Sequence, residues 1–501
     1  MKGKLRLRAK EGTFETLLRL RDSLGPVEAY LTGGFVRDTL LGRATADVDI
    51  VVAAPAMKLA PEVAHTLGGK YVALDEVNEI ARVVLRREEP LHLDFSTMRG
   101  SIEEDLSQRD FTIDAIAVDL NDIEKPSLPF IDPYDGSQDL ERRVVRAISE
   151  AGFVHDPARL LRGPRLAAEF GFAIDGNTKA LIQRHHELID TVAAERVRDE
   201  LCRLIAAPRA AQSLRLLDEL GLLLVILPEL SSTKGSEQPK EHFWDVFEHS
   251  VETVAAIDFV LRTEVSVYYG AGTLAFVPWS SELEEHFEEE ISSGHSRKTL
   301  LKLAALLHDV AKPATKAMDE RGRTRFLGHA KEGASIAEGI MERLRFSSRE
   351  KEMVQKMVMH HLRPGQLSGE GLPTHRAIYR YFRDTGDVAL DTIFLNLADH
   401  LATRGPELDL GEWQEQAQKL AYVLEERFRE ESIVSPPKLI DGHDLIDIFS
   451  LTPGPRIGKL LEAVREAQAA GDIATREEAL GFIQKRLSLK GAQKQNSHYH
   501  H

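Results

Sequence analysis

Two glycines and two aspartates lie close together in the segment TGGFVRDTLLGRATADVDIVV, residues 32–52. Residues two apart in a strand face the same side, so ADVDIVV predicts that Asp47 and Asp49 point together while Val48 and Ile50 face a core. Adjacent carboxylates repel each other, and a divalent cation between them relieves that repulsion. Mg²⁺ prefers carboxylate oxygens together with substrate phosphates, so the pair predicts a magnesium site.

The glycines predict a phosphate grip beside that site. Gly33 and Gly34 follow an apolar strand and open a helix, where bare backbone lets a ligand approach and the helix N-terminus attracts anions. Arg37 lies in the first turn of that helix and is expected to reach a triphosphate. Metal and phosphate together favour nucleotidyl transfer, in which metal lowers the pKa of an attacking hydroxyl and stabilises the leaving pyrophosphate. Taken alone, the pattern also fits a surface strand and an ordinary turn.

A third carboxylate is expected on another strand. The segment LHLDFS, residues 91–96, alternates in the same way and places His92, Asp94 and Ser96 on one face. Asp94 is therefore the candidate that completes the acidic site.

The elements that must position these groups follow an order along the chain. A short helical lead-in precedes a region of strand signals between residues 27 and 135, interrupted by the helical pieces VRDTLLG and APEVAHTLG. The expected strands are VEAYLT, DVDIVV, ARVVLRR, LHLDFS and FTIDAIAVDL. From about residue 147 the apolar residues recur at helical spacing. The fold class is therefore α+β with a long all-α continuation.

Composition narrows the class of protein. The chain has 501 residues, of which 43% are hydrophobic and 29% charged, as in a protein of several globular domains. Cys202 is the single cysteine, which excludes a disulfide framework and a cysteine-based zinc site. Because the sequence has neither a signal-peptide pattern nor an apolar run of about 18 residues, we expect a cytoplasmic protein.

The order GGFVRD then DVD resembles the head of the class II tRNA nucleotidyltransferases, the CCA-adding enzymes, and of the related bacterial poly(A) polymerases. Later segments resemble motifs of the same family: QRDFTIDAIAVD (108–119), HDPARLLRGPRLAAEFGF (155–172) and AERVRDEL (194–201). The resemblance implies a polymerase-beta-like head. It also implies ribose and triphosphate contacts by Arg109 and Asp110, recognition of the CTP or ATP base by Asp156 and Arg159, and a neck motif of Glu195, Arg196 and Glu200.

The base-reading pair has a physical basis. Asp156 and Arg159 are three residues apart and share one helix face, where an acceptor and a donor complement a Watson–Crick edge. Arg162 and Arg165 continue that face and are candidates for phosphate binding. Taken alone, these arginines also fit a surface helix covered by their aliphatic stems.

The chain departs from the family pattern at four points. His155 stands for Glu, Leu166 for Phe, and Asp114 for Asn in their motifs. In addition, only 14 residues separate Asp94 from Arg109, where complete CCA-adding relatives carry a flexible loop. In the family a shortened loop accompanies enzymes that add only C, which leaves the terminal A to a separate A-adding enzyme.

A second set of histidines and aspartates lies in the middle of the chain, in FEHSVETV, LLHDVAKP, LGHAKEGA, VMHHLRP and NLADHLAT. The order H…HD…H…HH…D resembles the HD phosphohydrolase superfamily, an all-helical metal-dependent fold. Imidazole and carboxylate ligands suit Mn, Ni, Fe or Co. Lys312, one turn after the HD pair, is placed to touch phosphate. The implied ligands are His249, His308, Asp309 and Asp399 for one metal, with His329, His360 and His361 as candidates for a second.

The leading prediction is a tRNA nucleotidyltransferase that adds C, and A if it completes CCA, from CTP and ATP, with Mg²⁺ in the head and an attached HD phosphohydrolase. Two alternatives stay open: a poly(A) polymerase, and a phosphohydrolase whose head merely binds nucleotide. The C-terminal segment resembles the tRNA-binding tail of the family. The expected parts are the lead-in (1–26), head (27–147), neck and body (148–232), HD domain (233–415) and helical tail (416–490).

Overall fold

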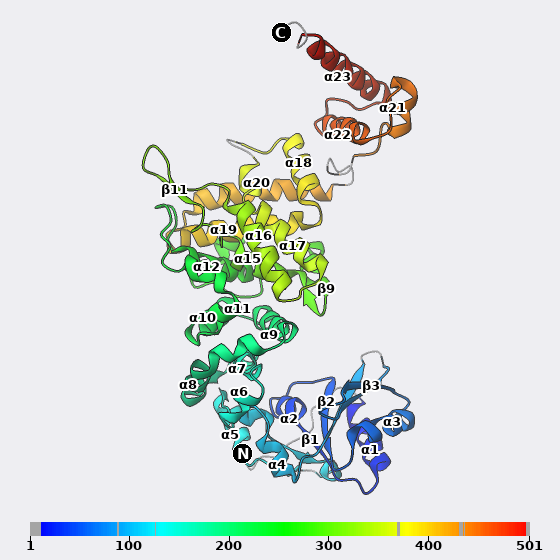
Figure 1. Ribbon diagram of the computed structural model, residues 1–501, viewed down its shortest axis with the longest axis vertical. Helices are drawn as coiled ribbons and strands as arrows, with labels where there is room; N and C mark the ends of the chain where they lie inside the picture. Colours follow the sequence, from blue (N-terminus) through cyan, green and yellow to red (C-terminus); the bar gives the residue numbers. More distant parts are fainter. Residues whose placement is uncertain are drawn as a thin grey trace. The chain divides into compact units, whose positions relative to one another are not determined.

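The computed structural model describes residues 12–87, 90–125, 127–367, 371–429, 434 and 436–496 (Figure 1). The chain divides into two compact units, residues 1–207 with 212–226, and residues 208–211 with 227–501. Within the described residues, no helix is both long and apolar enough to cross a membrane.

The first unit begins with a six-stranded mixed sheet in the order β3-β4-β5-β2-β1-β6, in which only β2 and β5 pair in parallel. Val48 and Ile50 are buried, whereas Asp47 is exposed and Asp49 is half-buried, as the alternation predicted. The strands are β1 (Ala29–Thr32), β2 (Asp47–Val52), β3 (Lys70–Asp75), β4 (Ile80–Leu85), β5 (Leu91–Thr97) and β6 (Val118–Asp119).

Helices cover this sheet and connect its strands. One of them, α3, packs against β3, β4, β5 and α1, whereas α2 packs against β1 and β2. The helices of this part are α1 (Thr13–Leu24), α2 (Gly33–Leu40), α3 (Ala56–Leu67), α4 (Ile102–Ser107) and α5 (Gly136–Arg142).

The rest of the first unit is almost entirely helical. Apolar side chains at helical spacing, such as Leu160, Leu161 and Leu201, are buried where α7 packs against α9. The helices that follow the head are α6 (Ala151–His155), α7 (Arg159–Phe170), α8 (Gly176–His185), α9 (Ala194–Ala206), α10 (Ala210–Glu219) and α11 (Leu222–Ile226).

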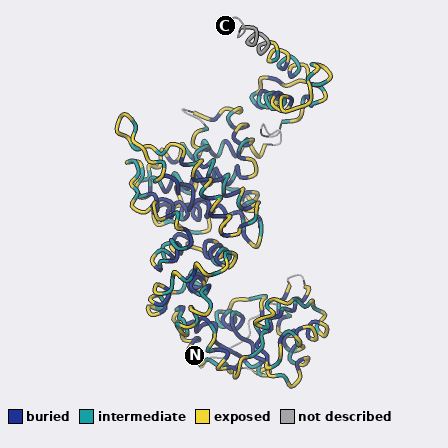
Figure 2. The backbone as a smooth tube through the Cα atoms, viewed as in Figure 1, coloured by how far each residue is buried: buried dark blue, intermediate teal, exposed yellow. Residues whose placement is uncertain are grey.

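The second unit is built on a group of packed helices in which α12 contacts α15 and α19, and α17 contacts α15, α16 and α19. Buried residues gather in the interior of this group (Figure 2). Its main helices are α12 (Val246–Val260), α15 (Arg297–Leu307), α16 (His329–Arg343), α17 (Ser348–His360), α19 (Ala389–Arg404) and α20 (Leu410–Phe428).

Smaller elements complete the second unit. The acidic segment 281–290 mostly forms α14 (Ser281–Glu288), which buries Leu283 and Phe287 and exposes its glutamates. The expected boundary between residues 415 and 416 falls inside α20, which packs against α19. The chain ends with α21 (Gly442–Phe449), α22 (Pro455–Ala469) and α23 (Arg476–Asn496), which share an apolar core around Leu445, Val464 and Ile483.

The sequence predicted most of these elements. The α+β class and the strands in DVDIVV, ARVVLRR and LHLDFS are confirmed. In contrast, FTIDAIAVDL forms only the two-residue β6 and a 3₁₀ turn, because its apolar residues are buried on all sides rather than on alternate faces. The strand β3 was missed, since it is an edge strand with no regular alternation of buried residues.

Candidate active site and metal centre

The Gly33–Gly34 turn lies directly against Asp49. Thr32, the last residue of β1, pairs with Asp49 of β2, and the chain then turns into α2. A Cβ atom on Gly33 would lie 2.8 Å from Asp49 Oδ2, and the φ angle of +58° is left-handed. Only glycine fits this position without strain, which explains why the glycine turn and the acidic pair occur together.

The three predicted carboxylates lie on two neighbouring strands. The register of β2 and β5 places Asp49 opposite Asp94, and Asp47 opposite His92, whose Nδ1 lies 2.8 Å from Asp47 Oδ1. Burial raises the pKa of Asp49 against the nearby charge of Arg109, and the carboxylate of Asp94 adds to the rise. A buried carboxylate beside a second one fits a divalent cation, which would stabilise the charged form of Asp49.

Asp94 has an arginine partner that the sequence analysis missed. Arg82 of β4 stands opposite Asp94, and its Nε and Nη2 each lie 2.7 Å from a carboxylate oxygen of Asp94. The alternation in ARVVLRR predicts a strand, but the sequence does not say which strand lies beside it. The third carboxylate is therefore next to Asp49, and it is already paired.

The QRD segment lies at the end of β1 and against α7. Arg109 Nη2 lies 3.3 Å from Thr32 Oγ1 and 3.2 Å from Asp105 Oδ2. Asp110 is buried, and Arg162 Nε lies 3.0 Å from its Oδ2. Burial alone would raise the pKa of Asp110, but the charge of Arg162 lowers it. The predicted residues thus form a charged wall, in which Arg162 is held by Asp110.

The base-reading pair is fixed by the neck. Asp156 follows α6, and both terminal nitrogens of Arg196 contact its carboxylate, at 2.9 and 3.1 Å. Arg159 Nε lies 3.8 Å from the same carboxylate, and its Nη2 donates to the Gln108 carbonyl at 3.0 Å. Arg196, predicted only as part of a structural motif, therefore positions the aspartate expected to accept from the base.

Arg165 does not join its neighbours as a phosphate ligand. Its Nε lies 2.6 Å from Glu200 and its Nη1 lies 2.7 Å from Glu169, and the side chain is buried. Arg165 therefore links α7 to α9. It lies far enough along α7 from Arg159 that its side chain enters the interface between the two helices. Glu195 is exposed on α9.

Arg37 also differs from the prediction. Its guanidinium is buried, donates to Asp114 at 2.6 Å and to Asp38 at 2.9 Å, and stacks over the Phe170 ring. The unusual aspartate at position 114 supplies the charge that holds this arginine. Arg37 is therefore held beside the glycine turn, where a Cβ atom on Gly34 would lie 3.3 Å from Arg37 Nη2, and two carboxylates already engage its charge.

One cleft of about 810 Å³ joins most of the predicted groups. The carboxylates Asp47 and Asp94 are not among its lining residues, and neither are Arg37 and Arg165. The groups that do line it include Gly33, Gly34, Asp49, Arg109, Asp110, Asp114, His155, Asp156, Arg159, Arg162 and Arg196. The cleft thus connects a metal-binding carboxylate and a phosphate-binding turn to a donor–acceptor pair.

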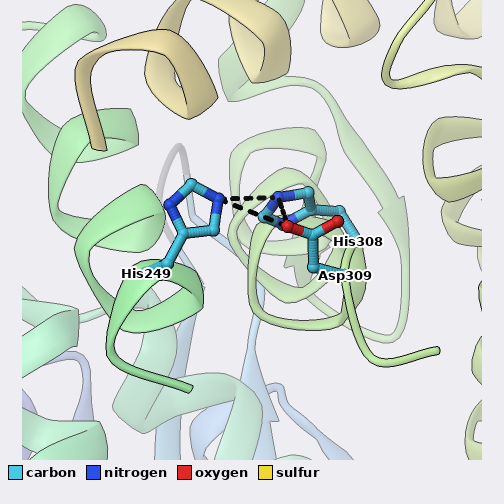
Figure 3. A group of neighbouring side chains, drawn as sticks. All are labelled: His249, His308 and Asp309. Carbon is cyan, nitrogen blue, oxygen red and sulfur yellow. Dashed lines mark hydrogen bonds and ion pairs between the residues drawn. The ribbon is translucent and has the colours of Figure 1, made fainter. Parts of the chain in front are cut away.

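In the second unit, the predicted residues His249, His308 and Asp309 meet in the helical interior (Figure 3), and Asp399 joins them. His249 Nε2 lies 3.3 Å from His308 Nε2, 3.4 Å from Asp309 Oδ2 and 3.1 Å from Asp399 Oδ1. Burial alone would lower the pKa of His308, but Asp309 and Asp399 raise it to about 10. Convergent imidazoles and carboxylates that are buried fit a metal ion, which would take up their charge.

A second group shares Asp309 with the first. Asp309 Oδ1 lies 3.4 Å from His329 Nε2 and 3.8 Å from His361 Nε2, and these two ring nitrogens are 3.4 Å apart. Asp309 thus offers one oxygen to each group of candidate ligands.

The histidine rings of this centre are fixed from behind. In His308, His329 and His361 the Nδ1 atom lies 2.6 to 2.7 Å from the backbone carbonyl three residues earlier. With Nδ1 as donor, the Nε2 lone pair points into the centre, which is the tautomer a metal ligand requires.

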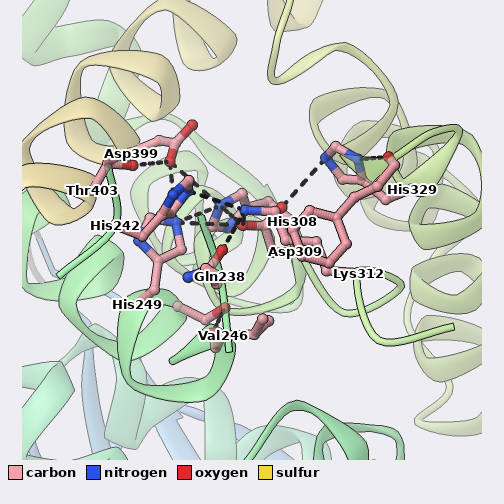
Figure 4. Close-up of polar contacts among 12 residues, drawn as sticks. Gln238, His242, Val246, His249, His308, Asp309, Lys312, His329, Asp399 and Thr403 are labelled. Atoms are coloured by element: carbon pink, nitrogen blue, oxygen red, sulfur yellow. Dashed lines mark hydrogen bonds and ion pairs between the residues drawn. The ribbon is translucent and has the colours of Figure 1, made fainter. Parts of the chain in front are cut away.

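Lys312 lies within the centre rather than at its edge (Figure 4). Its Nζ is 2.6 Å from Asp309 Oδ2 and 2.7 Å from Gln238 Oε1, and it lies 3.4 Å from His242 Nε2. Burial, together with the Lys312 charge, lowers the pKa of His242 to about 4. His242 and Gln238 precede α12 and match no motif, so the sequence alone did not mark them as part of the centre.

Of the two adjacent histidines at the end of α17, only His361 reaches the centre. His361 is buried, whereas His360 is half-buried and lies near Arg363 and Asp384. Adjacent residues on a helix point about 100° apart, so both cannot face one site. The expectation that His360 is a ligand of the second metal is therefore corrected in favour of His361.

Asp399 connects the centre to solvent. Its side chain is 17% exposed, against 1% or less for His249, His308 and Asp309. A pocket of about 270 Å³ opens over it and is lined by Asp399 and by polar side chains that include Asn396, His400, Thr403, Arg404 and Gln416.

Comparisons with protein families give four matches along the chain. Residues 29–146 match the poly A polymerase head domain, and residues 279–404 match the HD domain, which leaves His249 outside the matched range. Residues 171–234 match a probable RNA- and SrmB-binding site of polymerase A. Residues 406–483 match a tRNA nucleotidyltransferase domain.

Full-length relatives agree with these matches. The chain is 34% identical to a CC-adding tRNA nucleotidyltransferase from Thermus thermophilus, covering 91% of this chain and 93% of the relative. It is 33% identical to an A-adding tRNA nucleotidyltransferase from Deinococcus radiodurans, over 92% and 96%. The solved Thermotoga maritima CCA-adding enzyme complexed with tRNA shares the fold, with a TM-score of 0.59 at 23% identity over 95% of each chain.

Proposed function

The chain belongs to the tRNA nucleotidyltransferase family, and we propose that its head adds C residues to the 3′ end of tRNA from CTP. The observation that carries this proposal is the cleft in which Asp49 and the glycine turn share one space with Asp156, Arg159 and Arg162. A binding module without catalysis would not need the carboxylate against the phosphate grip. A poly(A) polymerase and a phosphohydrolase with a nucleotide-binding head are less well supported, because the full-length relatives are tRNA nucleotidyltransferases.

The residues divide the reaction between them. Asp47 and Asp49 would hold Mg²⁺, which when bound activates the attacking 3′ hydroxyl and stabilises the departing pyrophosphate. The backbone of Gly33 and Gly34 and the side chain of Arg109 would hold the triphosphate. Asp156 would accept from the cytosine amino group, and Arg159 and Arg162 would donate to the acceptors of its Watson–Crick edge.

The choice of C rests on a short connection. After β5 ends at Thr97, only residues 98–101 precede α4, where Ser101 and Glu104 form a capping box that fixes the helix start. The chain therefore has little room here for the long flexible loop associated with complete CCA addition. We propose CC addition, with a separate A-adding enzyme completing the end.

The deciding experiment measures nucleotide incorporation. Purified protein with Mg²⁺ receives tRNA lacking CCA, tRNA ending in C-C, or an unrelated oligonucleotide, with CTP and ATP offered singly and together. We expect incorporation of C alone, on the first substrate only, and loss of activity in Asp49→Asn. Incorporation of A would overturn the choice of C, and no incorporation on any tRNA would overturn the whole proposal.

We also propose a phosphohydrolase activity in the HD centre with Mn, Ni, Fe or Co as metal. His249, His308, Asp309 and Asp399 would hold one ion, and the pocket over Asp399 would admit a phosphate ester. Metal content by elemental analysis and hydrolysis of p-nitrophenyl phosphate, with Asp309→Asn as the control, test this activity. A wild-type protein that binds metal but hydrolyses no ester would contradict it.

The remaining assignments follow from these roles. We propose that residues 27–147 form the catalytic head, that residues 148–232 contribute base and RNA recognition, and that the tail after α20 binds tRNA. Because the substrates are tRNA and nucleoside triphosphates, the proposal places the protein in the cytoplasm.

A further inference from the structure

Three charged side chains form a straight row across the sheet of the head. The register of β2, β5 and β4 places Asp49 opposite Asp94, and Asp94 opposite Arg82. Paired residues on neighbouring strands face the same side, so the row reads carboxylate, carboxylate, guanidinium on one face. The arginine stands at the end of the row away from the glycine turn.

The two carboxylates of the row differ in their partners. Both oxygens of Asp94 accept from Arg82, at 2.7 Å each, which is the bidentate geometry that binds most strongly. Among the described residues, Asp49 has no lysine or arginine within salt-bridge distance, and its strand-mate Asp47 pairs only with His92. A cation can therefore use Asp47 and Asp49 directly, whereas it would have to compete with an arginine for Asp94.

Arg82 keeps donors for a further partner. A guanidinium carries five N–H groups, and the contact with Asp94 engages only two of them, on Nε and Nη2. The side chain is 30% exposed, and it makes no other hydrogen bond within the described part of the chain. Its outer edge is thus free to bind an anion, and Asp94 fixes the plane in which it does so.

The position of the row indicates which anion this is. The nucleotide cleft is lined by Asp49 but not by Asp47, Asp94 or Arg82. With a nucleoside triphosphate in the cleft, the acceptor strand has to bring its 3′ hydroxyl to the carboxylate pair from outside it. An arginine beside that approach meets the phosphodiester backbone of the acceptor strand, which guanidinium groups bind through paired hydrogen bonds.

We propose that Arg82 binds a backbone phosphate near the 3′ end of the tRNA acceptor strand, and that Asp94 positions Arg82 instead of serving as a third metal ligand. This inference rests on the proposed tRNA nucleotidyltransferase activity. It assigns to Asp94 a role different from the one that its spacing in the sequence suggested.

Binding and kinetics of four variants test the proposal. They are Arg82→Gln, Arg82→Lys, Asp94→Asn and the double variant that combines Arg82→Gln with Asp94→Asn. We expect Arg82→Gln and Asp94→Asn each to raise the KM for tRNA about tenfold, while the KM for CTP and the half-saturating Mg²⁺ concentration stay unchanged. The KM of the double variant for tRNA should not exceed that of the more impaired single variant, because both substitutions act through the same phosphate contact. Arg82→Lys should recover part of the loss.

Direct tRNA binding in EDTA keeps this test independent of turnover. There Arg82→Gln should weaken binding about tenfold and reduce the slope of affinity against salt by about one ion. Arg21→Gln is the matched control, because Arg21 is also an arginine paired with carboxylates on the head, Asp22 and Glu124, and is outside the row. Melting temperatures identify any variant that fails to fold.

Two results would overturn the proposal. A fall of about 1,000-fold in kcat for Asp94→Asn with a raised Mg²⁺ requirement would make Asp94 a metal ligand. Unchanged tRNA affinity in Arg82→Gln would remove the phosphate contact. If the wild-type protein binds tRNA through Arg82 but incorporates no nucleotide, the fault lies in the proposed activity and not in this contact.

Discussion

The head and the HD helices both crowd ionisable side chains together, but they do so by opposite means. In the head, Asp49 and Asp94 become neighbours through strand register. Asp49 lines an open cleft, and Asp94 pairs with Arg82 beside it on the sheet. In the HD centre, His249 of α12 and Asp309 of the turn after α15 are almost fully removed from water, and only Asp399 of α19 is partly exposed.

This difference in exposure to water determines how each site is prepared for its ligand. A buried cluster loses its hydration on folding, so its ring nitrogens are already oriented toward a ligand before the ligand binds. Loss of one member leaves the other buried polar groups without a partner, which is costly. An open cleft keeps part of its hydration and exchanges it for substrate. We therefore expect variants of the head to change substrate binding and turnover, and variants of the HD centre to change metal content and stability.

The largest expected effect separates the two sites. Asp49→Asn should lower nucleotide incorporation by at least about 1,000-fold, because it removes a charge from the metal pair, while metal content of the HD centre and the melting temperature stay unchanged. Asp309→Asn should do the reverse: metal is lost and the protein melts earlier, while incorporation by the head persists. Loss of incorporation in Asp309→Asn would break the comparison, since the two sites would then act as one.

The sequence predicted the head more completely than the HD centre. Period-two alternation around Asp47 and Asp49 states directly which side chains share a face, and the glycine turn has one geometric reason to lie beside them. Strand neighbours are not written in the sequence, however, so Arg82 was missed and Asp94 appeared unpaired. Likewise, the charge partner of Arg37 is Asp114, 77 residues away, and no local pattern reveals it.

In the HD centre the order of motifs identified the ligand types but not every ligand. Two adjacent histidines carry the same motif, and only the packing of α17 against α15 and α16 decides which of them faces inward. His242 and Gln238 lie in the segment before α12, where neither periodicity nor motif marks a site. These residues become visible only when distant helices are brought together.

The adjacent histidines give the next largest effect. His361→Ala should weaken metal binding about 100-fold, because it removes a ring nitrogen that faces Asp309, whereas His360→Ala should leave the affinity within a factor of two. Titration with metal in an isothermal calorimeter measures the metal affinity of both variants. Since the two substitutions remove the same side chain one position apart, equal effects would refute the assignment of His361.

A smaller effect is expected in nucleotide choice. Arg196→Gln should reduce the preference for CTP over UTP about tenfold, because Asp156 loses the two contacts that orient it toward the base. Asp156→Asn should cause a similar loss, and the double variant should add little. The measurement is the ratio of kcat/KM for the two nucleotides. A uniform fall in both values would mean that Arg196 supports the helix and not selectivity.

The smallest effect compares two matched ion pairs. Glu350 and Glu150 each lie 2.7 Å from a histidine, but the pair Glu350–His295 is buried whereas Glu150 of the pair Glu150–His185 is exposed. Burial alone would raise the pKa of Glu350, and hydrogen bonds from His295 and Ser347 lower it below its ordinary value of 4.5. Glu350→Gln should therefore lower the free energy of unfolding by about 1–3 kcal/mol at pH 7.

The sign of the pH dependence follows from that lowered pKa. In the folded protein Glu350 stays ionised to lower pH than in the unfolded chain, so its contribution is present above pH 4.5 and is lost as the pH falls through the folded-state pKa. Denaturation by urea at pH 7 and pH 3.5 should show a difference between wild type and Glu350→Gln that shrinks in acid. Glu150→Gln is the matched control and should change stability much less at neutral pH, because solvent screens an exposed pair. Equal losses in both variants would show that burial does not make the pair Glu350–His295 more stabilising than the pair Glu150–His185.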